Sequence, residues 1–223
     1  MTQLNKNKKS CKDVFNALML SNADYVGNIE MPLIKCNHSE PADLIPFSKI
    51  NSCLDYNKWV HFYEHDYIIE RIWKHPMKYL DKLKQFAGVI TPDFSLYRDM
   101  PLMMQMYNIF RSRMVGRWLQ DNGIDVIVNI RYGDERTYKF SCLGVCKHCT
   151  ISIGTYGSIK DKENRRFLEK GLPIIINSIQ PKTLIIYGSV SKPIIELCNK
   201  YNINLIIFKS DFEKTHFSTK EVS

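Results

Sequence analysis

PKTLIIYGSVSKPIIELCNKYNINLIIF, residues 181–208, decides the fold of this chain. It contains a strand pattern at 182–188, a helical pattern from Pro193 through Lys200, and a second strand pattern at 203–208. Two strands joined by a helix in so short a segment predict a parallel βαβ unit with a right-handed crossover. The segment therefore places the chain in the α/β class.

The same alternation extends toward the N-terminus. Earlier strand patterns are KWVHFY (58–63), AGVITP (87–92), IDVIVNI (124–130) and TISIG (150–154). The clearest helix between them covers 101–123, beginning at Pro101 and ending at Gly123, and another begins near Asp161. The predicted fold is a mainly parallel sheet of about six strands with alternating helices. Either an open doubly wound sheet or an incomplete barrel satisfies the pattern, since a complete barrel typically needs about 250 residues.

This pattern divides the chain into three parts. Residues 1–57 are predicted to be an irregular N-terminal extension that wraps the core, beginning with a helix at 11–20 (CKDVFNALML). Residues 58–208 form the α/β domain, and 209–223 form a polar C-terminal tail. The sites of interest should then lie in the middle part.

Composition is that of an ordinary folded protein, with 223 residues, 44% apolar and 24% charged. No apolar run approaches the roughly 18 to 20 residues that cross a bilayer, so we expect no membrane partner. Asp13 and Asn16 interrupt what would be the apolar region of a signal peptide, which favours a cytoplasmic location. The net charge of +8 belongs mostly to residues 111–223, which carry +7.

Three of the seven cysteines, Cys142, Cys146 and Cys149, have the C-x3-C-x2-C spacing of radical S-adenosylmethionine enzymes. In those enzymes the motif follows the first strand, and most of the barrel comes after it. Here only about three strand patterns follow Cys149. A zinc site would need a fourth ligand such as His148 or Cys198, brought close by the tertiary structure. We therefore predict no metal and no cofactor, with the cysteines serving as packing or loop residues.

Parallel sheets bind ligands beyond the carboxyl ends of their strands. Asp93 and Asp134 each follow a strand pattern and are the predicted catalytic carboxylates if their strands are neighbours. The alternative is that each is only a turn residue. The other predicted ligand or phosphate contacts are Ser95, Arg113, Arg131, Gly154, Thr155, Gly157 and Lys160.

The turn GTYGSIK (154–160) is the most suggestive of these sites, because two glycines, a helix start and Lys160 could meet at one anion. It lacks the P-loop pattern, and two glycines between a strand and a helix are also common turn chemistry. Phosphate binding and a plain turn both stay open.

Basic residues gather on the helix at 101–123 and just after Asp161. The predicted nucleic-acid contacts are Arg111, Arg117, Lys162, Arg165 and Arg166. Arg113 and Arg117 are four residues apart and could grip one carboxylate or phosphate together. The alternative is a solvated arginine face. Met103, Met104 and Tyr107 belong to the apolar face that we expect to be core.

Several motifs resemble those of an uncharacterised family of domains of unknown function, carried mainly by phages, plasmids and other mobile elements of low-GC Gram-positive bacteria. They are PDFSLYRDMP (92–101), RSR (111–113), RYGDE (131–135), GTYGSIKDKENRRFLEKGL (154–172) and PKTLIIYG (181–188), within a resemblance that covers roughly 55–190. The family pattern has proline and serine where this chain has Cys146 and Cys149, which argues further against a metal. The resemblance implies an accessory role in a mobile element, such as replication or its control.

Three functions follow as hypotheses. The first is a nucleic-acid-associated accessory protein of a plasmid or phage, acting in replication or copy-number control. The second is an incomplete-barrel enzyme or a nucleotide- or phosphate-binding protein with its site at the carboxyl ends of the strands. The third is a protein-interaction module that blocks a host factor.

Overall fold

A computed structural model describes residues 13–156, 159 and 161–211. In this part of the chain seven strands form one parallel sheet, in the same order along the sheet as along the chain. The strands are β3 (Leu44–Pro46), β4 (Trp59–His61), β5 (Gly88–Ile90), β6 (Val126–Asn129), β7 (Thr150–Gly154), β8 (Thr183–Tyr187) and β9 (Asn204–Phe208).

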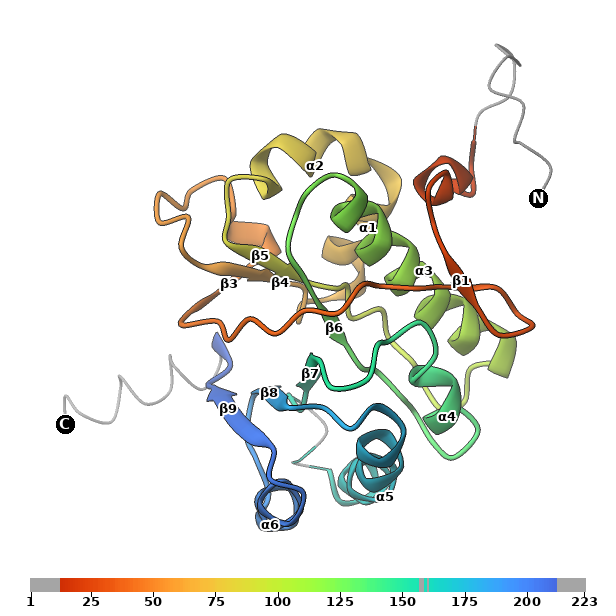
Figure 1. The fold of residues 1–223 in the computed structure, drawn as a ribbon, viewed down its shortest axis with the longest axis vertical. Helices are drawn as coiled ribbons and strands as arrows, with labels where there is room; N and C mark the ends of the chain where they lie inside the picture. The colour runs from red at the N-terminus through yellow and green to blue at the C-terminus, as the bar shows by residue number, and fades with distance from the viewer. Residues whose placement is uncertain (1–12, 157–158, 160, 212–223) are drawn as a thin grey trace.

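This strand order decides between the two predicted architectures. A doubly wound sheet reverses its strand order at a switch point, whereas here each strand pairs in parallel with the next one in sequence. The sheet curls into a half-barrel, with the helices around its convex side and β3 and β9 at its edges (Figure 1). The incomplete-barrel alternative is therefore confirmed.

The helices follow the predicted chemistry of starts and stops. They are α1 (Asp66–Lys74), α2 (Pro76–Leu83), α3 (Leu102–Asp121), the short α4 (Tyr138–Ser141), α5 (Lys162–Ile179) and α6 (Lys192–Lys200). Helix α3 begins after Pro101, and its chain turns away at Gly123, whose φ is +82°. Asp161 caps α5 by accepting a hydrogen bond from the Asn164 N–H at 2.7 Å.

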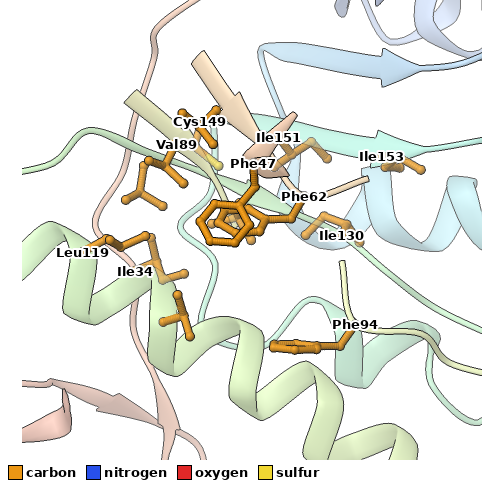
Figure 2. Close-up of a cluster of buried hydrophobic side chains, with 14 of the residues drawn as sticks. Ile34, Phe47, Phe62, Val89, Phe94, Leu119, Ile130, Cys149, Ile151 and Ile153 are labelled. Atoms are coloured by element: carbon orange, nitrogen blue, oxygen red, sulfur yellow. The ribbon is translucent and has the colours of Figure 1, made fainter. Parts of the chain in front are cut away.

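Each strand divides its side chains between two faces. Outward residues such as Val60, Val89 and Ile151 pack under the helices in the main core. Figure 2 shows this core, in which Phe47 and Phe62 lie between the strands and α3. Inward residues form a second, smaller cluster on the concave face, composed of Leu44, Trp59, Ile90, Ile127, Ile185 and Tyr187. The concave face leads directly to the carboxyl ends of the strands.

The N-terminal segment contributes more to the sheet than we predicted. Strand β3 lies within 1–57, so the sheet has seven strands rather than about six. The same segment carries a two-stranded sheet, β1 (Tyr25–Val26) with β2 (Met31–Pro32), and then wraps the core. Its Ile34 N–H donates to the Gly144 carbonyl at 3.0 Å. Strand β3 was missed because three residues, one of them proline, carry almost no periodic signal.

The two ends of the described chain also differ from the predictions. In place of the helix predicted at 11–20 there is a short 3-10 helix, η1 (Ala17–Leu20), while Cys11 and Lys12 lie outside the described residues. Of the predicted tail, Lys209, Ser210 and Asp211 are described. The Asp211 carboxylate binds Lys49 of the 3-10 helix η2 (Phe47–Lys49) at 3.0 Å, which connects the two edges of the half-barrel.

One prediction for α3 was wrong. Met103, Met104 and Tyr107 are 72%, 51% and 44% exposed. The first turns of α3 instead bury Gln105 and Ile109, so a different face of the helix is turned inward. Among the described helices, none combines the length and the apolar composition that crossing a membrane requires.

Candidate functional site

Two cavities open at the carboxyl ends of the strands, where parallel sheets place ligands. The cavity that we call the large lobe has a volume of about 560 Å³ and includes Tyr97, Arg98 and Asn164 in its wall. The small lobe has a volume of about 360 Å³ and includes His61 and Asp93. Arg131, Gly154 and Tyr156 line both lobes, so the lobes form one cleft with a shared wall.

Asp93 follows β5 and binds residues that end or follow β6. Its Oδ1 accepts from the Asn129 side chain at 2.6 Å, and its Oδ2 accepts from Arg131 Nη1 at 3.1 Å. The Asp93 side chain is 11% exposed and that of Arg131 is 29% exposed. Asp93 and Arg131, both predicted from the sequence, therefore form an ion pair in the wall of the cleft.

Burial raises the pKa of the Asp93 carboxyl above its usual value, and it outweighs the opposing effects of Arg131 and the Asn129 hydrogen bond. The negative charge of Asp66 raises the pKa of Asp93 further. A carboxyl group with a raised pKa in a cleft is typical of an acid–base residue. A structural ion pair can also shift a pKa, so the acid–base role of Asp93 depends on its position in the cleft and on its partners.

A hydrogen-bonded chain continues from Asp93 into the concave face. The Tyr63 hydroxyl lies 2.6 Å from Ser152 Oγ and donates a hydrogen bond to Asn129 Oδ1 at 3.2 Å. The Tyr63 ring stacks on Tyr187 with centroids 4.8 Å apart and planes 12° apart. Burial raises the pKa of Tyr63 well above its usual value, so its hydroxyl keeps its proton.

Gly154 at the end of β7 makes room for this tyrosine. A Cβ atom at Gly154 would lie 2.7 Å from the Tyr63 ring, a distance at which the ring must move. His61, two residues before Tyr63, lies 4.4 Å from Tyr187 between ring centroids. Its Nδ1 accepts the Tyr63 N–H at 3.2 Å. The glycine is thus part of the cleft wall rather than only a turn residue.

Sequence reasoning missed His61, Tyr63, Asn129 and Tyr187. The pattern KWVHFY carries the available signal, since Trp59, His61 and Tyr63 alternate and therefore share one face of a strand. The pattern cannot say which face is concave, because that depends on how all seven strands curl.

Asp134 has a different setting from Asp93. Its carboxylate is gripped by the Arg136 guanidinium, with Arg136 Nη2 at 2.7 Å, and this hydrogen bonding lowers the pKa of Asp134. Among the described residues, Asp93 and Asp134 make no contact with each other, and Asp134 lines neither lobe. The structure therefore does not bring the two predicted carboxylates together.

Of the remaining predicted ligand contacts, one lies in the cleft with Asp93 and Arg131. Ser95 lines the small lobe, and its N–H donates to Asp66 at 3.0 Å. Thr155 is buried, and its hydroxyl donates to the Ser189 carbonyl at 2.6 Å, which is a structural contact. Gly157 and Lys160 lie outside the described residues. The carboxylate of Asp161 caps the start of α5, where a phosphate would otherwise compete for the same amide.

The arginines of α3 point into the protein. Arg113 is 1% exposed and donates to three carbonyl oxygens, those of Leu143, Asn129 and Ser141. Burial lowers the pKa of Arg113 to about 10. The Arg113 guanidinium is enclosed by protein, so its contacts are structural and it does not reach a ligand in the cleft. The alternative of a solvated arginine face does not apply at this position.

Arg117 and Arg111 also have protein partners. Arg117 is 3% exposed and binds Asp24 and Asp121 at 3.1 and 3.0 Å. Arg111 pairs with Glu70 and lies 3.9 Å from the Phe94 ring centroid. Because of these contacts, neither arginine presents an exposed guanidinium for the predicted binding of nucleic acid.

The basic residues of α5 are more accessible. Lys162 and Arg166 are exposed, whereas Arg165 is half-buried and donates to the Ile159 carbonyl. Asn164, in the same turn, lines the large lobe. Lys162 and Arg166 are each two residues from Asn164 and therefore project from a different side of α5, and neither lines a lobe.

Two cysteines of the motif, Cys146 and Cys149, lie close to Cys36, whereas Cys142 has a different setting. Cys149 is buried and its thiol donates to the Cys146 carbonyl at 3.0 Å, whereas the Cys142 thiol donates to the Tyr138 carbonyl at 3.5 Å. Burial raises the pKa of Cys149 to about 12, so this thiol stays protonated. In the described part of the chain, no three His, Cys, Asp or Glu side chains are placed to hold a metal ion. The absence of a metal stays a prediction.

The buried Asp93 gives a pH dependence that can be measured. Because folding raises the pKa of Asp93, its ionisation destabilises the folded state as pH rises above the usual value of 3.8. The side-chain amide introduced by Asp93→Asn does not titrate. We therefore expect the stability of Asp93→Asn relative to the wild type to increase between about pH 4 and pH 7. Urea unfolding at several pH values measures it, and a difference that stays constant or decreases contradicts the shift.

Fold and cleft together define a class of protein, the parallel α/β half-barrel with a polar cleft at the carboxyl ends of its strands. The chain belongs to the family described as Domain of unknown function (DUF4417), whose model matches residues 23–208. No solved structure matches the chain.

Two phage proteins are similar to this chain. The Gene 1 protein of Mycobacterium phage L5 is 34% identical over 131 residues, covering 59% of this chain and 57% of the phage protein. The Gene 1 protein of Mycobacterium phage D29 is 32% identical over 129 residues, covering 58% and 48%. The chain thus matches about half the length of these relatives. The phage association is confirmed for the family, whereas the plasmid and low-GC Gram-positive setting stays a prediction.

Proposed function

We propose that the protein binds a phosphate-bearing ligand in the cleft, with Arg131 as the anion contact and Asp93 as a group that can exchange a proton. The Asp93–Arg131 pair carries this proposal. Arg131 uses Nη1 for Asp93, and its Nε and Nη2 have no partner among the described residues, while its side chain lines both lobes. A guanidinium with spare donors beside a carboxyl of raised pKa suits phosphate binding with acid–base chemistry.

The experiment compares Arg131→Gln with a matched control. Arg136→Gln removes a similar ion pair, Arg136 with Asp134, that lies outside both lobes. Titration of adenosine monophosphate by calorimetry should show a Kd raised about tenfold to a hundredfold in Arg131→Gln, since charge-assisted hydrogen bonds contribute about 1.5–3 kcal/mol. Arg136→Gln should bind as the wild type does.

Asp93→Asn separates the role of the carboxyl from that of the guanidinium. Both proteins should show the pH dependence that comes from the ligand, whose phosphate has a second pKa of about 6. The wild type should show an additional change in affinity across the titration of Asp93, which Asp93→Asn should lack. The proposal fails if the wild type binds none of inorganic phosphate, pyrophosphate and adenosine monophosphate, or if both arginine variants lose binding equally.

A second candidate function is association with nucleic acid as a phage accessory protein, in replication or copy-number control. The exposed Lys162 and Arg166 of α5 and the net charge of +8 support it. The protein contacts of Arg111 and the burial of Arg117 remove part of the basic surface on which it relied. An oligonucleotide used in the same titration tests this candidate, since binding should weaken as salt rises.

A further inference from the structure

Aromatic side chains line both lobes of the cleft. The small lobe has His61, Tyr63 and Tyr187 in its wall, and the large lobe has Tyr97. Tyr156 lines both, and Tyr97 and Tyr156 are 57% and 51% exposed. Stacking of a nucleic-acid base on an aromatic ring contributes about 1–3 kcal/mol. In the small lobe the rings of His61, Tyr63 and Tyr187 pack on one another, and His61 and Tyr187 are only 1% and 4% exposed. The accessible ring for a flat heterocycle is therefore Tyr156 in the small lobe and Tyr97 in the large lobe.

Arg131 lies where the two lobes meet, because it lines both of them. Its Nη1 is bound to Asp93, so the side chain is held at this junction of the lobes. A phosphate bound by Arg131 would thus have an aromatic lobe on each side. This arrangement suits a ligand whose phosphate lies in its middle rather than at its end.

The charge of the cleft limits how many negative charges the ligand carries. Arg98 donates to Glu163 at 2.8 Å, and Lys49 binds Asp211 at 3.0 Å, so these cations already have carboxylate partners. Asp99 adds a carboxylate to the large lobe. Among the described residues of the cleft, little positive charge is left in excess, which fits one phosphodiester charge better than the three or four charges of a triphosphate.

Resting on the phosphate-binding function above, we propose that the ligand is a phosphodiester joining two nucleosides, with one base in each lobe and the phosphate on Arg131. The lobes, at about 560 and 360 Å³, are each of the size of a small-molecule site. The same chemistry occurs in a free dinucleotide and in two successive nucleotides of a single strand.

The test titrates the full chain with the dinucleoside monophosphate ApA, adenosine monophosphate, ATP and inorganic phosphate, and with a twelve-residue oligoadenylate. ApA should bind about tenfold or more tighter than adenosine monophosphate or ATP, because a second base stacks. Because a twelve-residue strand offers eleven overlapping dinucleotides, an oligoadenylate that binds more than about a hundredfold tighter than ApA identifies a nucleic-acid strand as the source. An advantage no larger than this roughly tenfold statistical factor identifies a free dinucleotide.

Two tyrosine variants, one in the cleft and one at the opposite end of the strands, complete the test. Tyr97→Ala should remove most of the advantage of ApA over adenosine monophosphate. Tyr201→Ala, at a tyrosine 41% exposed between α6 and β9 at the opposite end of the strands, should keep it. Equal binding of ApA and adenosine monophosphate, or tighter binding of ATP, overturns the two-lobed ligand while leaving phosphate binding intact. If none of the phosphate compounds binds, both proposals fall.

Discussion

Replacing Arg113 with alanine is expected to lower the free energy of unfolding by about 4 kcal/mol. Its guanidinium donates to the carbonyl oxygens of Leu143 at 3.1 Å, Asn129 at 3.2 Å and Ser141 at 2.7 Å. The substitution leaves these oxygens without donors and opens a cavity at one of the largest fully buried side chains. Urea unfolding followed by circular dichroism measures the loss.

The control for this prediction is Arg71→Ala, at an exposed arginine on α1, which should change stability by less than about 0.5 kcal/mol. Arg113→Lys should fall between the two, because an ammonium can reach some of the carbonyl oxygens but lacks the guanidinium fork. A loss below about 1 kcal/mol in Arg113→Ala would show that the buried hydrogen bonds contribute little.

Gly144→Ala is expected to destabilise the fold by about 3 kcal/mol. Gly144 has a φ of +73°, which disfavours any residue with a Cβ, and that Cβ would lie 2.3 Å from the Pro32 carbonyl oxygen. Backbone cannot rotate away as a side chain can. The N-terminal segment that follows β2 would have to separate from the loop after α4, breaking the Ile34 to Gly144 hydrogen bond.

Gly123→Ala is the matched control, because Gly123 has a φ of +82° but nothing within 4 Å of a Cβ. It should cost only about 1 kcal/mol, the conformational penalty alone. The difference between the two variants in thermal or urea unfolding then measures the backbone contact. Equal losses would show that the N-terminal segment adjusts without penalty.

Arg113→Ala and Gly144→Ala both remove or disrupt contacts between distant parts of the chain. The sequence predictions were weakest for contacts of this kind. The helix at 101–123 was predicted well because Pro101 and Gly123 mark its ends locally. The burial of Arg113 and Arg117 was not predicted, since helical spacing puts two arginines on one face without saying what covers that face. The covering groups come from 22–33 and from 129–143.

The candidate site divides in the same way. Asp93 and Arg131 could be selected because each follows a strand pattern, and carboxyl ends of parallel strands share one edge. Asp134 satisfied the same rule, but Arg136, two residues away, takes its carboxylate. Tyr63 and Tyr187 were invisible as a pair, because β4 and β8 are separated by three strands and approach only when the sheet curls.

The sequence by itself determined the α/β class, the parallel strands, most helix boundaries and the edge of the sheet where a site belongs. These depend on hydrophobic periodicity and on capping residues, which act over a few positions. Only the tertiary structure decided the half-barrel, the strand β3 and the joining of Asp93, Arg131, Asn129 and Tyr63 into one cleft. Those features depend on the curl of the whole sheet. The curl results from the pairing and twist of all seven strands, so no single segment of the sequence predicts it.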